Sequence, residues 1–183
     1  MKLSGRLRRR AVSGALLGTV LLAAAGCGSS ALERAHARGQ LSIWLTGYSW
    51  QDNTPPGSAI VSHPVLHREA GGTGTFADPI TVAVSGHDAT MAWPAGTRFY
   101  LPSVKRYVIV EDSGASKAPS GTDGHLDMWI DGQGGTKSDT DDCMDQMTSE
   151  HAPAVINPPV GLPVLAGPIY AHNTCNIPPN ADS

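Results

Sequence analysis

The sequence predicts a mainly β fold that closes, or nearly closes, into a small barrel. The chain has 183 residues with 21 glycines and 14 prolines, while aromatic residues make up 5%. This composition favours a turn-rich β domain over a helical bundle. Short segments rich in Val, Ile, Tyr or Trp are bounded by Gly, Pro, Asp or Asn, as strands are. Several are apolar on both faces, "RYVIVED" (106–112) among them, which suits a closed barrel better than a sheet with one wet face.

Six segments are predicted to be strands, namely 42–46, 58–63, 79–85, 97–102, 106–112 and 125–131. Long loops rich in glycine and proline connect them. One short helix is predicted over 138–150, because Ser138 or Asp139 can cap its first turn and acidic residues follow at the positive end of its dipole. The segment "AVIN" (154–157) is a further candidate strand. We expect a single barrel domain over 43–178.

The N-terminus has the pattern of a secretory signal. A basic start is followed by an apolar stretch that is somewhat short for a membrane span, and small residues precede Cys27. "LAAAGC" resembles the bacterial lipobox, in which the cysteine is lipidated. We therefore expect a lipoprotein-type signal peptide over 1–26, a tether over 27–42, and anchoring to the outer face of a bacterial cytoplasmic membrane. The alternative is an ordinary cleaved signal in which Cys27 is incidental.

The cysteines, the net charge and the histidines indicate which cross-links, ligands and partners to expect. Cys143 and Cys175 are expected to pair as a disulfide, since exported cysteines meet an oxidising compartment. The net charge of −3 gives no reason to expect nucleic-acid binding. His63 and His67 have the spacing of helical metal ligands, but Pro64 argues against a helix there. We expect no metal, no cofactor and a monomeric protein.

Two carboxylates, Asp112 and Asp127, stand out because their neighbours are apolar. A buried carboxylate is costly unless it is paired or protonated. If their strands are neighbours, both carboxylates can face one groove. Enzymes that cleave glycosidic bonds usually do so with such a pair of carboxylates. Trp129 lies on the same strand face as Asp127 and could stack on a sugar or desolvate the carboxyl group. The alternative is that both carboxylates accept backbone hydrogen bonds at strand ends.

Several motifs in order resemble the double-psi β-barrel. "DPITVAVS", "PAGTRFYLPSVKRYVIVEDSGA" and "GHLDMWIDG" are similar to the 3D (three-aspartate) domain of lytic transglycosylases. Asp112 matches the second aspartate and Asp127 the third, but Ser85 stands where the first is expected. A closer resemblance, over residues 47–175, is to secreted and mostly uncharacterised fungal and bacterial proteins that share "DNTPPG", "AGGTGTFADPIT" and "VINPPVGLPV". Rare lipoprotein A, expansins and family-45 endoglucanases share the barrel.

The resemblance implies a six-stranded double-psi β-barrel with long loops and one short helix, and a role on polysaccharide or peptidoglycan. It implies Asp127 as the general acid and base, with Asp112 next. The residues expected to bind the glycan are Trp129, His125, Tyr48, Asp52, His67 and Asp78. The first hypothesis is a glycan-cleaving enzyme, either a glycoside hydrolase or a lytic transglycosylase. The alternatives are an expansin-like binder that loosens polysaccharide without cleaving it, and a protein-binding module such as an inhibitor.

The lipobox-like motif yields a direct prediction. Replacing Cys27 by Ser should move the protein from the membrane fraction to the soluble fraction, because the thiol that carries the lipid is lost. Fractionation and immunoblotting of cells that express each form will measure this. Wild-type protein found entirely in the medium would contradict lipidation.

Overall fold

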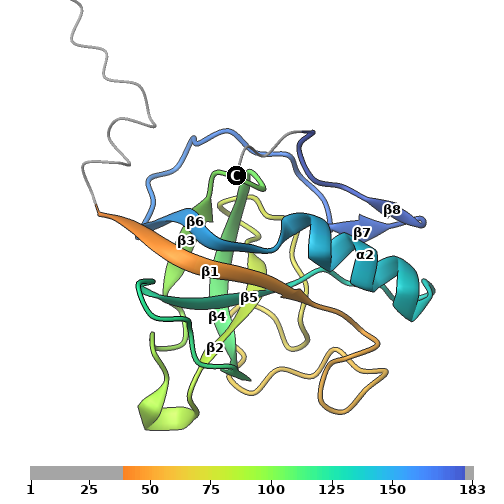
Figure 1. The fold of residues 1–183 in the computed structure, drawn as a ribbon, viewed down its shortest axis with the longest axis horizontal. Coiled ribbons are helices and arrows are strands. Elements are labelled where there is room, and N and C mark those ends of the chain that lie inside the picture. The colour runs from red at the N-terminus through yellow and green to blue at the C-terminus, as the bar shows by residue number, and fades with distance from the viewer. Residues whose placement is uncertain (1–38, 180–183) are drawn as a thin grey trace, which may run out of the picture.

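Residues 39–179 are described by a computed structural model, and they form a closed six-stranded barrel (Figure 1). The predicted signal peptide, Cys27 and most of the tether lie outside these residues. The barrel strands are β1 (Gln40–Tyr48), β2 (Ile80–Ser85), β3 (Arg98–Leu101), β4 (Arg106–Ala115), β5 (Gly124–Trp129) and β6 (Ser149–Ile156). The helix α2 (Lys137–Met147), the short 3-10 helix η1 (Asp88–Thr90) and the small hairpin of β7 (Tyr170–Ala171) and β8 (Thr174–Cys175) complete the fold.

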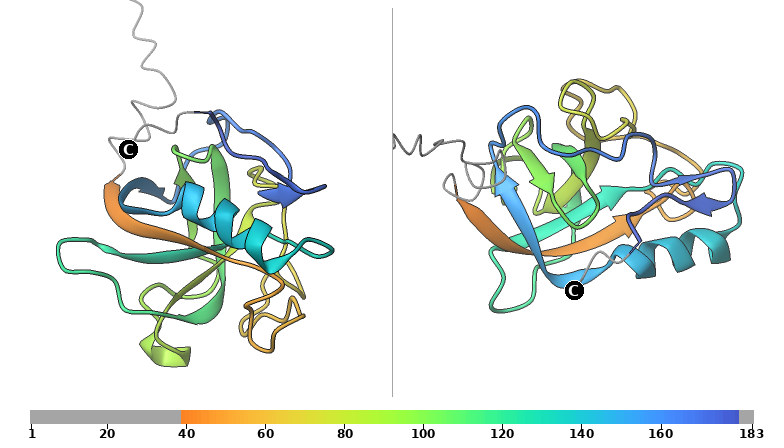
Figure 2. Two further views of the ribbon diagram at one scale, coloured as in Figure 1. Left: turned by 45° about the vertical axis from the view of Figure 1, so that its right-hand side comes forward. Right: turned by 90° about the horizontal axis from the view of Figure 1, so that it is seen from above.

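The strands follow the order β1-β5-β2-β4-β3-β6 around the barrel. The β1/β5 and β2/β4 pairs are parallel, and the other four pairs are antiparallel. The predicted mainly β class, the closed six-stranded barrel and the single short helix are thus confirmed within the described part of the chain. Two further views show α2 lying along β1, with the β7/β8 hairpin near the helix (Figure 2).

One predicted strand is wrong. Segment 58–63 is an irregular loop that makes only an isolated bridge, between Ile60 and Glu69. Its apolar residues turn alternately inward and outward like those of a strand, with Ala59 buried and Ile60 exposed. Its backbone, however, forms no ladder: Ser62 N–H donates to the Asp112 carboxylate, and His63 N–H donates to the carbonyl oxygen of Glu111. The sixth barrel strand is β6, which ends with the first three residues of the candidate "AVIN" segment.

Apolar side chains that alternate along the strands fill the barrel. Leu126, Met128 and Ile130, which alternate along one face of the segment, are all fully buried. The same core contains Ile43, Leu45, Val82, Val84, Phe99, Val108, Val110 and Ala154. Each fully buried side chain of this size stabilises the fold by roughly 1.5–3 kcal/mol. The core therefore fixes the strands from which the polar side chains project.

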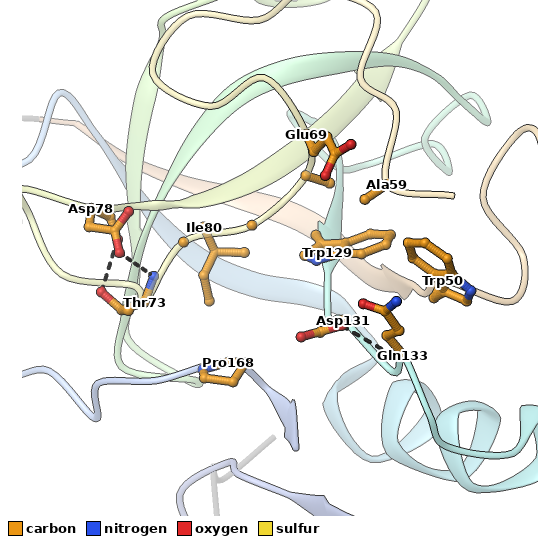
Figure 3. Close-up of a pocket in the computed structure, with 13 residues that line it drawn as sticks. Trp50, Ala59, Glu69, Thr73, Asp78, Ile80, Trp129, Asp131, Gln133 and Pro168 are labelled. Carbon is orange, nitrogen blue, oxygen red and sulfur yellow. Dashed lines mark hydrogen bonds between the residues drawn. The ribbon is translucent and has the colours of Figure 1, made fainter. Parts of the chain in front are cut away.

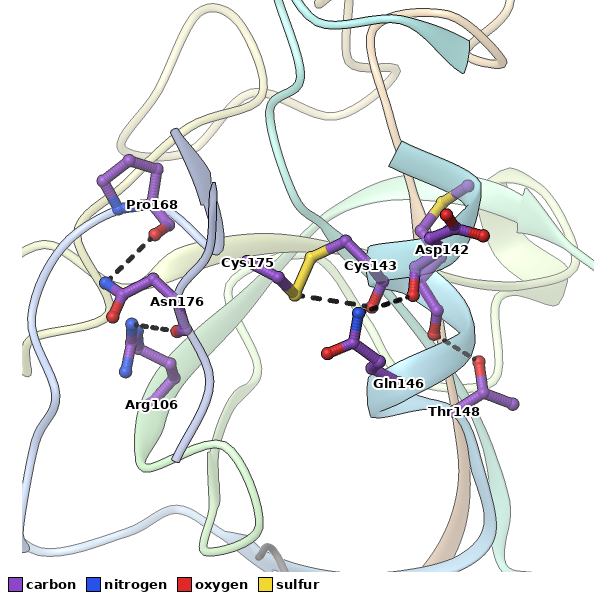
Figure 4. The surroundings of a disulfide bond; sticks show 9 residues. Arg106, Asp142, Cys143, Gln146, Thr148, Pro168, Cys175 and Asn176 are labelled. Atoms are coloured by element: carbon purple, nitrogen blue, oxygen red, sulfur yellow. Dashed lines mark hydrogen bonds between the residues drawn. A yellow bond between two sulfur atoms is a disulfide. The ribbon is translucent and has the colours of Figure 1, made fainter. Parts of the chain in front are cut away.

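The predicted disulfide joins α2 to β8 (Figure 4). Cys143 and Cys175 are 32 residues apart, and their Cα atoms are separated by 5.4 Å. The helix itself begins at Lys137, one residue earlier than expected, because the Thr136 hydroxyl accepts from Asp139 N–H and caps it. The tail is also held by Arg106, a fully buried side chain that donates to the carbonyl oxygens of Gly167 and Asn176.

A bulge in β4 separates the roles of two adjacent acidic residues. Along the β2/β4 pair, Val82 faces Val110 but Ala83 faces Asp112, so that Glu111 is the extra residue. A bulge re-aims the side chains beside it, and bulges are frequent next to active sites. Glu111 is fully buried, and Asp112 lines a surface cleft.

The buried carboxylate of Glu111 holds the long loop between β1 and β2. Its Oε1 atom accepts from the N–H groups of Val65, Leu66 and His67. Its Oε2 atom accepts from the Thr81 hydroxyl, and it lies 2.7 Å from Nδ1 of His67. The other ring nitrogen of His67 lies 2.9 Å from Asp78. A protonated imidazole can donate to both carboxylates, whereas a neutral one can donate to only one.

The pKa values reflect this arrangement. Burial alone would lower the pKa of His67, but its hydrogen bonds to Asp78 and Glu111 outweigh burial and raise it. Burial would raise the pKa of Glu111, but the hydrogen bonds from His67 and its neighbours lower it overall. The pKa of Asp78 is lowered by the same pairing, again against the effect of burial.

The disulfide should stabilise the fold mainly by shortening the loops of the unfolded chain. Closing a loop of this length contributes about 3–4 kcal/mol on the loop-entropy model. Replacing both Cys143 and Cys175 by Ser should lower the free energy of unfolding in urea by about that amount. A double variant as stable as the wild type would contradict this role.

The His67 contacts should make stability depend on pH at both ends. The raised pKa means that the His67 contribution is complete below about pH 6.5 and is lost as the pH rises through the folded-state value. The lowered pKa of Glu111 means that its contribution is lost as the pH falls from about 4.3. His67→Asn should therefore cost most near pH 5–6, by about 1–3 kcal/mol, and less at pH 9.

Urea unfolding across this pH range measures the difference between wild type and variant. His151→Asn is the control, because that exposed ring contacts only the Ser42 hydroxyl among the described residues. A cost of His67→Asn that does not change with pH would contradict the paired arrangement.

Candidate functional site

Strand register places the two candidate catalytic carboxylates in one row. Asp127 on β5 pairs with Thr46 on β1 and, on its other side, with Ala83 on β2. Ala83 in turn pairs with Asp112 on β4. The row across the four strands therefore runs Thr46, Asp127, Ala83, Asp112, with the small alanine side chain between the two carboxylates.

A cleft of about 420 Å³ opens over this row. We call it the acidic cleft. Its lining residues are Tyr48, Asp52, Asn53, Thr54, Ile60, Ser62, Ala83, His87, Asp112, Ser113, Gly114, Ala115 and Asp127. Of the residues that the sequence analysis singled out, the acidic cleft brings together Asp127, Asp112, Tyr48 and Asp52.

Asp127 is partly buried at the cleft wall, and one of its oxygens accepts a short hydrogen bond from the Thr46 hydroxyl. Burial is the largest influence on its pKa and raises it. The Thr46 bond and the charge of His125 lower the pKa, while the nearby carboxylates of Asp52 and Asp112 raise it. The net shift is upward. A carboxyl group with a raised pKa in a cleft is suited to donate a proton.

Asp112 is held very differently. Its Oδ1 atom accepts from the Ser62 hydroxyl at 2.8 Å, from Ser62 N–H at 3.1 Å and from its neighbour Ser113 N–H at 2.9 Å. Its Oδ2 atom accepts from the Tyr48 hydroxyl at 3.3 Å. These donors fix the carboxylate as an acceptor. The expectation that Asp112 accepts backbone hydrogen bonds and the expectation that it faces a groove are therefore both met.

The Tyr48 hydroxyl interacts electrostatically with the carboxylates of both Asp112 and Asp127. Burial raises its pKa well above the usual value, and the charges of Asp112 and Asp127 raise it further. The phenol thus remains a hydrogen-bond donor toward Asp112. Asp52 is exposed at the cleft rim, where its Oδ1 atom accepts from Ser49 N–H and the Ser49 hydroxyl.

Trp129 and Asp78 lie in a second cleft, of about 330 Å³. Figure 3 shows Trp129 beside Trp50, with Glu69 and Asp131 to either side of the indole rings. We call it the tryptophan cleft. Alternation along β5 predicts that Trp129 and Asp127 project to the same side and line the same cleft. The Tyr48 ring instead lies edge-on to Trp129, with ring centroids 5.2 Å apart, and Tyr48 lines the acidic cleft in place of Trp129. Tyr48 thus separates the two clefts.

The two predicted histidines line neither cleft. His125 is 2% exposed, lies behind Asp127 and stacks on Trp44 with ring centroids 4.1 Å apart. His67 belongs to the Glu111 network. Neither imidazole ring is therefore placed to contact a glycan bound in one of the two clefts.

Sequence reasoning missed Thr46, Ser62, His87 and Ser113. Thr46 contacts Asp127, and the other three line the acidic cleft. Their only signal in the sequence is their position beside strands that carry the two aspartates. Glu111 was also missed, although it directly precedes Asp112, because a bulge leaves no mark in the alternation of a strand that is apolar on both faces.

Two general features bear on what the protein can bind. Within residues 39–179, no group of three or more His, Cys, Asp or Glu side chains is arranged to hold a metal ion. No helix in this part of the chain is long and apolar enough to cross a membrane.

Comparison with known proteins places this barrel in a family without an assigned function. An uncharacterized protein of Dictyostelium discoideum, DDB_G0273701/DDB_G0273221, is 39% identical over 118 residues, which are 62% of this chain and 49% of that protein. The chain thus spans about half the length of this relative. No solved structure matches the chain. The family described as the DDB_G0273701 N-terminal domain matches residues 40–176, and the chain belongs to this family.

Proposed function

We propose that this protein is an exported, lipid-anchored protein that cleaves a polysaccharide or peptidoglycan, with Asp127 as the general acid and base in the acidic cleft. The observation that carries the proposal is the contrast between two carboxylates in one cleft. Asp127 has a raised pKa, and Asp112 is fixed as an acceptor by four hydrogen bonds. Paired titratable groups in opposed environments are how acid and base roles are assigned at neutral pH.

In this mechanism the carboxyl proton of Asp127 passes to the glycosidic oxygen, whose bond to the sugar carbon breaks. Asp112 faces the positive charge that develops on the sugar, or directs the attacking water. Neighbouring strands are about 4.8 Å apart, so the two aspartate Cα atoms, two strands apart, are about 10 Å from each other.

The proposal includes the double-psi class of barrel. Two parallel pairs, β1/β5 and β2/β4, within an otherwise antiparallel six-stranded barrel support it. The aspartates resembling those of the 3D domain then lie on β4 and β5, at the acidic cleft. Fold likeness alone does not assign chemistry, so the argument for cleavage rests on the cleft.

A second candidate is an expansin-like protein that binds and loosens polysaccharide without cleaving it. The tryptophan cleft favours it, because the half-buried Trp50 indole, which lies beside the buried Trp129 and near carboxylates, suits stacking on a sugar ring and hydrogen bonding to its hydroxyls. Asp112 is also already engaged by four donors, so only one of the two candidate catalytic carboxylates, Asp127, is without such a set of donors. A protein-binding, inhibitor-like role is a weaker alternative, since the domain carries clefts rather than a flat surface.

Replacing Asp127 by Asn tests the proposed acid. The amide keeps the shape and can still accept from Thr46, but it has no titrating proton. Cleavage of the glycan that the wild type cuts should fall by roughly 10²- to 10⁴-fold. The melting temperature should stay the same or rise, because an unfavourably buried carboxyl group is removed. Reducing-end assays and thermal melts measure the two effects.

Asp145→Asn, on the exposed side of α2, is the matched control and should change neither quantity. Full activity of Asp127→Asn would place the site elsewhere. Loss of folding in Asp127→Asn would make the residue a structural acceptor. If the wild type binds polymer but releases no product, the expansin-like role replaces cleavage, and Trp129→Ala should then weaken retention on the polymer.

A further inference from the structure

A chain of three side chains leads from the backbone carbonyl of Ser116 to the acidic cleft. Nδ1 of His125 lies 2.9 Å from the carbonyl oxygen of Ser116. Nε2 of the same ring lies 2.7 Å from the Thr46 hydroxyl, which also forms the short bond to Asp127 Oδ1. The chain thus runs from Ser116 through His125 and Thr46 to Asp127.

The Ser116 carbonyl fixes which ring nitrogen carries a proton. A carbonyl oxygen only accepts, so Nδ1 of His125 must carry a hydrogen to make this bond. Any proton that His125 gains or loses therefore sits on Nε2, the atom that faces Thr46. Trp44 covers one face of the ring, and His125 is 2% exposed, so water does not compete for these contacts.

The Thr46 hydroxyl has one hydrogen and lies between two groups. In one arrangement the Asp127 carboxyl group donates to Thr46, and Thr46 donates to Nε2. In the other, the Nε2–H group of a charged imidazole donates to Thr46, and Thr46 donates to the Asp127 carboxylate. The two arrangements contain the same number of protons, and each makes every hydrogen bond in the chain.

Removing that one proton breaks the chain. A neutral His125 and a charged Asp127 are then both acceptors on either side of a single hydroxyl hydrogen. Thr46 can serve only one of them, and the other is left without a donor in a mostly buried place. Such an unsatisfied group is costly, so the three side chains favour keeping the proton.

The surroundings act in the same direction. The titratable groups around Asp127 are Tyr48 from β1, Asp52 and His87 from the loops, Asp112 from β4 and His125 from its own strand. Asp52 and Asp112 are carboxylates, and a further negative charge on Asp127 would repel them.

We propose that Asp127, Thr46 and His125 form a relay that holds one proton in common, in which Thr46 and His125 are positioning residues that keep Asp127 supplied with the proton it donates in the cleft. This inference rests on the proposed function for its role in catalysis. It also explains why His125 lies behind Asp127 instead of lining the cleft.

The proton balance of one turnover is complete. The carboxyl group turns its O–H bond from Thr46 to the glycosidic oxygen, which takes the proton and keeps the electrons of the broken C–O bond. Thr46 then turns its hydroxyl from Nε2 to the new carboxylate. The attacking water or substrate hydroxyl loses one proton as it bonds to the sugar carbon, and the return of that proton refills the relay.

Nuclear magnetic resonance titration of the purified protein tests the relay without a substrate. In the wild type, the Asp127 carboxyl carbon and His125 Nε2 should change at one common pH midpoint, because the pair titrates as a unit. Thr46→Val keeps the shape but removes the hydroxyl, and the two midpoints should then separate by at least about one pH unit. Thr46→Ser should restore the common midpoint.

Ser42→Ala is the control, since it removes another β1 hydroxyl that contacts a histidine, the exposed His151. Separate midpoints in the wild type, or a common midpoint in Thr46→Val, would overturn the relay. The wild-type titration decides the matter even if Thr46→Val does not fold. A wild type that titrates as a unit but cleaves no glycan would leave the relay standing and refute the proposed function.

Discussion

The bulge at Glu111 is the constraint on which the rest of the site depends. One extra residue in β4 leaves Glu111 without a partner on β2, and its buried carboxylate holds the long β1–β2 loop, while Asp112 pairs with Ala83 beside the cleft. The loop that Glu111 holds supplies Ser62, which binds Asp112. Without the extra residue, the regular register would pair Ala83 with Glu111 instead of Asp112, and Asp112 would not lie in the row that contains Asp127. Core packing and cleft geometry are therefore set by the same local irregularity.

The acidic cleft follows from how four strands meet in the closed barrel. Parallel pairing of β1 with β5 brings Thr46 beside Asp127, and β2 places the small Ala83 between Asp127 and Asp112. A larger residue than Ala83 would fill the floor of the cleft between the carboxylates. The chemistry proposed for Asp127 thus depends on strand order, which connects residues that are about 80 positions apart in the chain.

The sequence predicted most of the strands, since alternation and bounding glycines are local signals. It failed for 58–63, whose inward and outward alternation is real but whose backbone makes only single bonds to β4 and to the covering loop instead of a strand ladder. It placed Asp127, Asp112, Tyr48 and Asp52 in one groove, largely through resemblance. It misplaced Trp129, because alternation does not reveal that the Tyr48 ring would divide two clefts. Register, bulges and side-chain relays such as that through Thr46 arise from long-range pairing, which no local pattern records.

The central claim is that the acidic cleft cleaves a glycan. The most direct measurement is to incubate the purified protein with a panel of insoluble polymers, including peptidoglycan, cellulose and chitin, and to analyse released fragments by mass spectrometry. Hydrolysed and anhydro ends differ in mass by one water, so the spectrum reports both the substrate and the type of reaction. Our account predicts soluble fragments with one type of new end from at least one polymer. The absence of fragments from every polymer tested would contradict it.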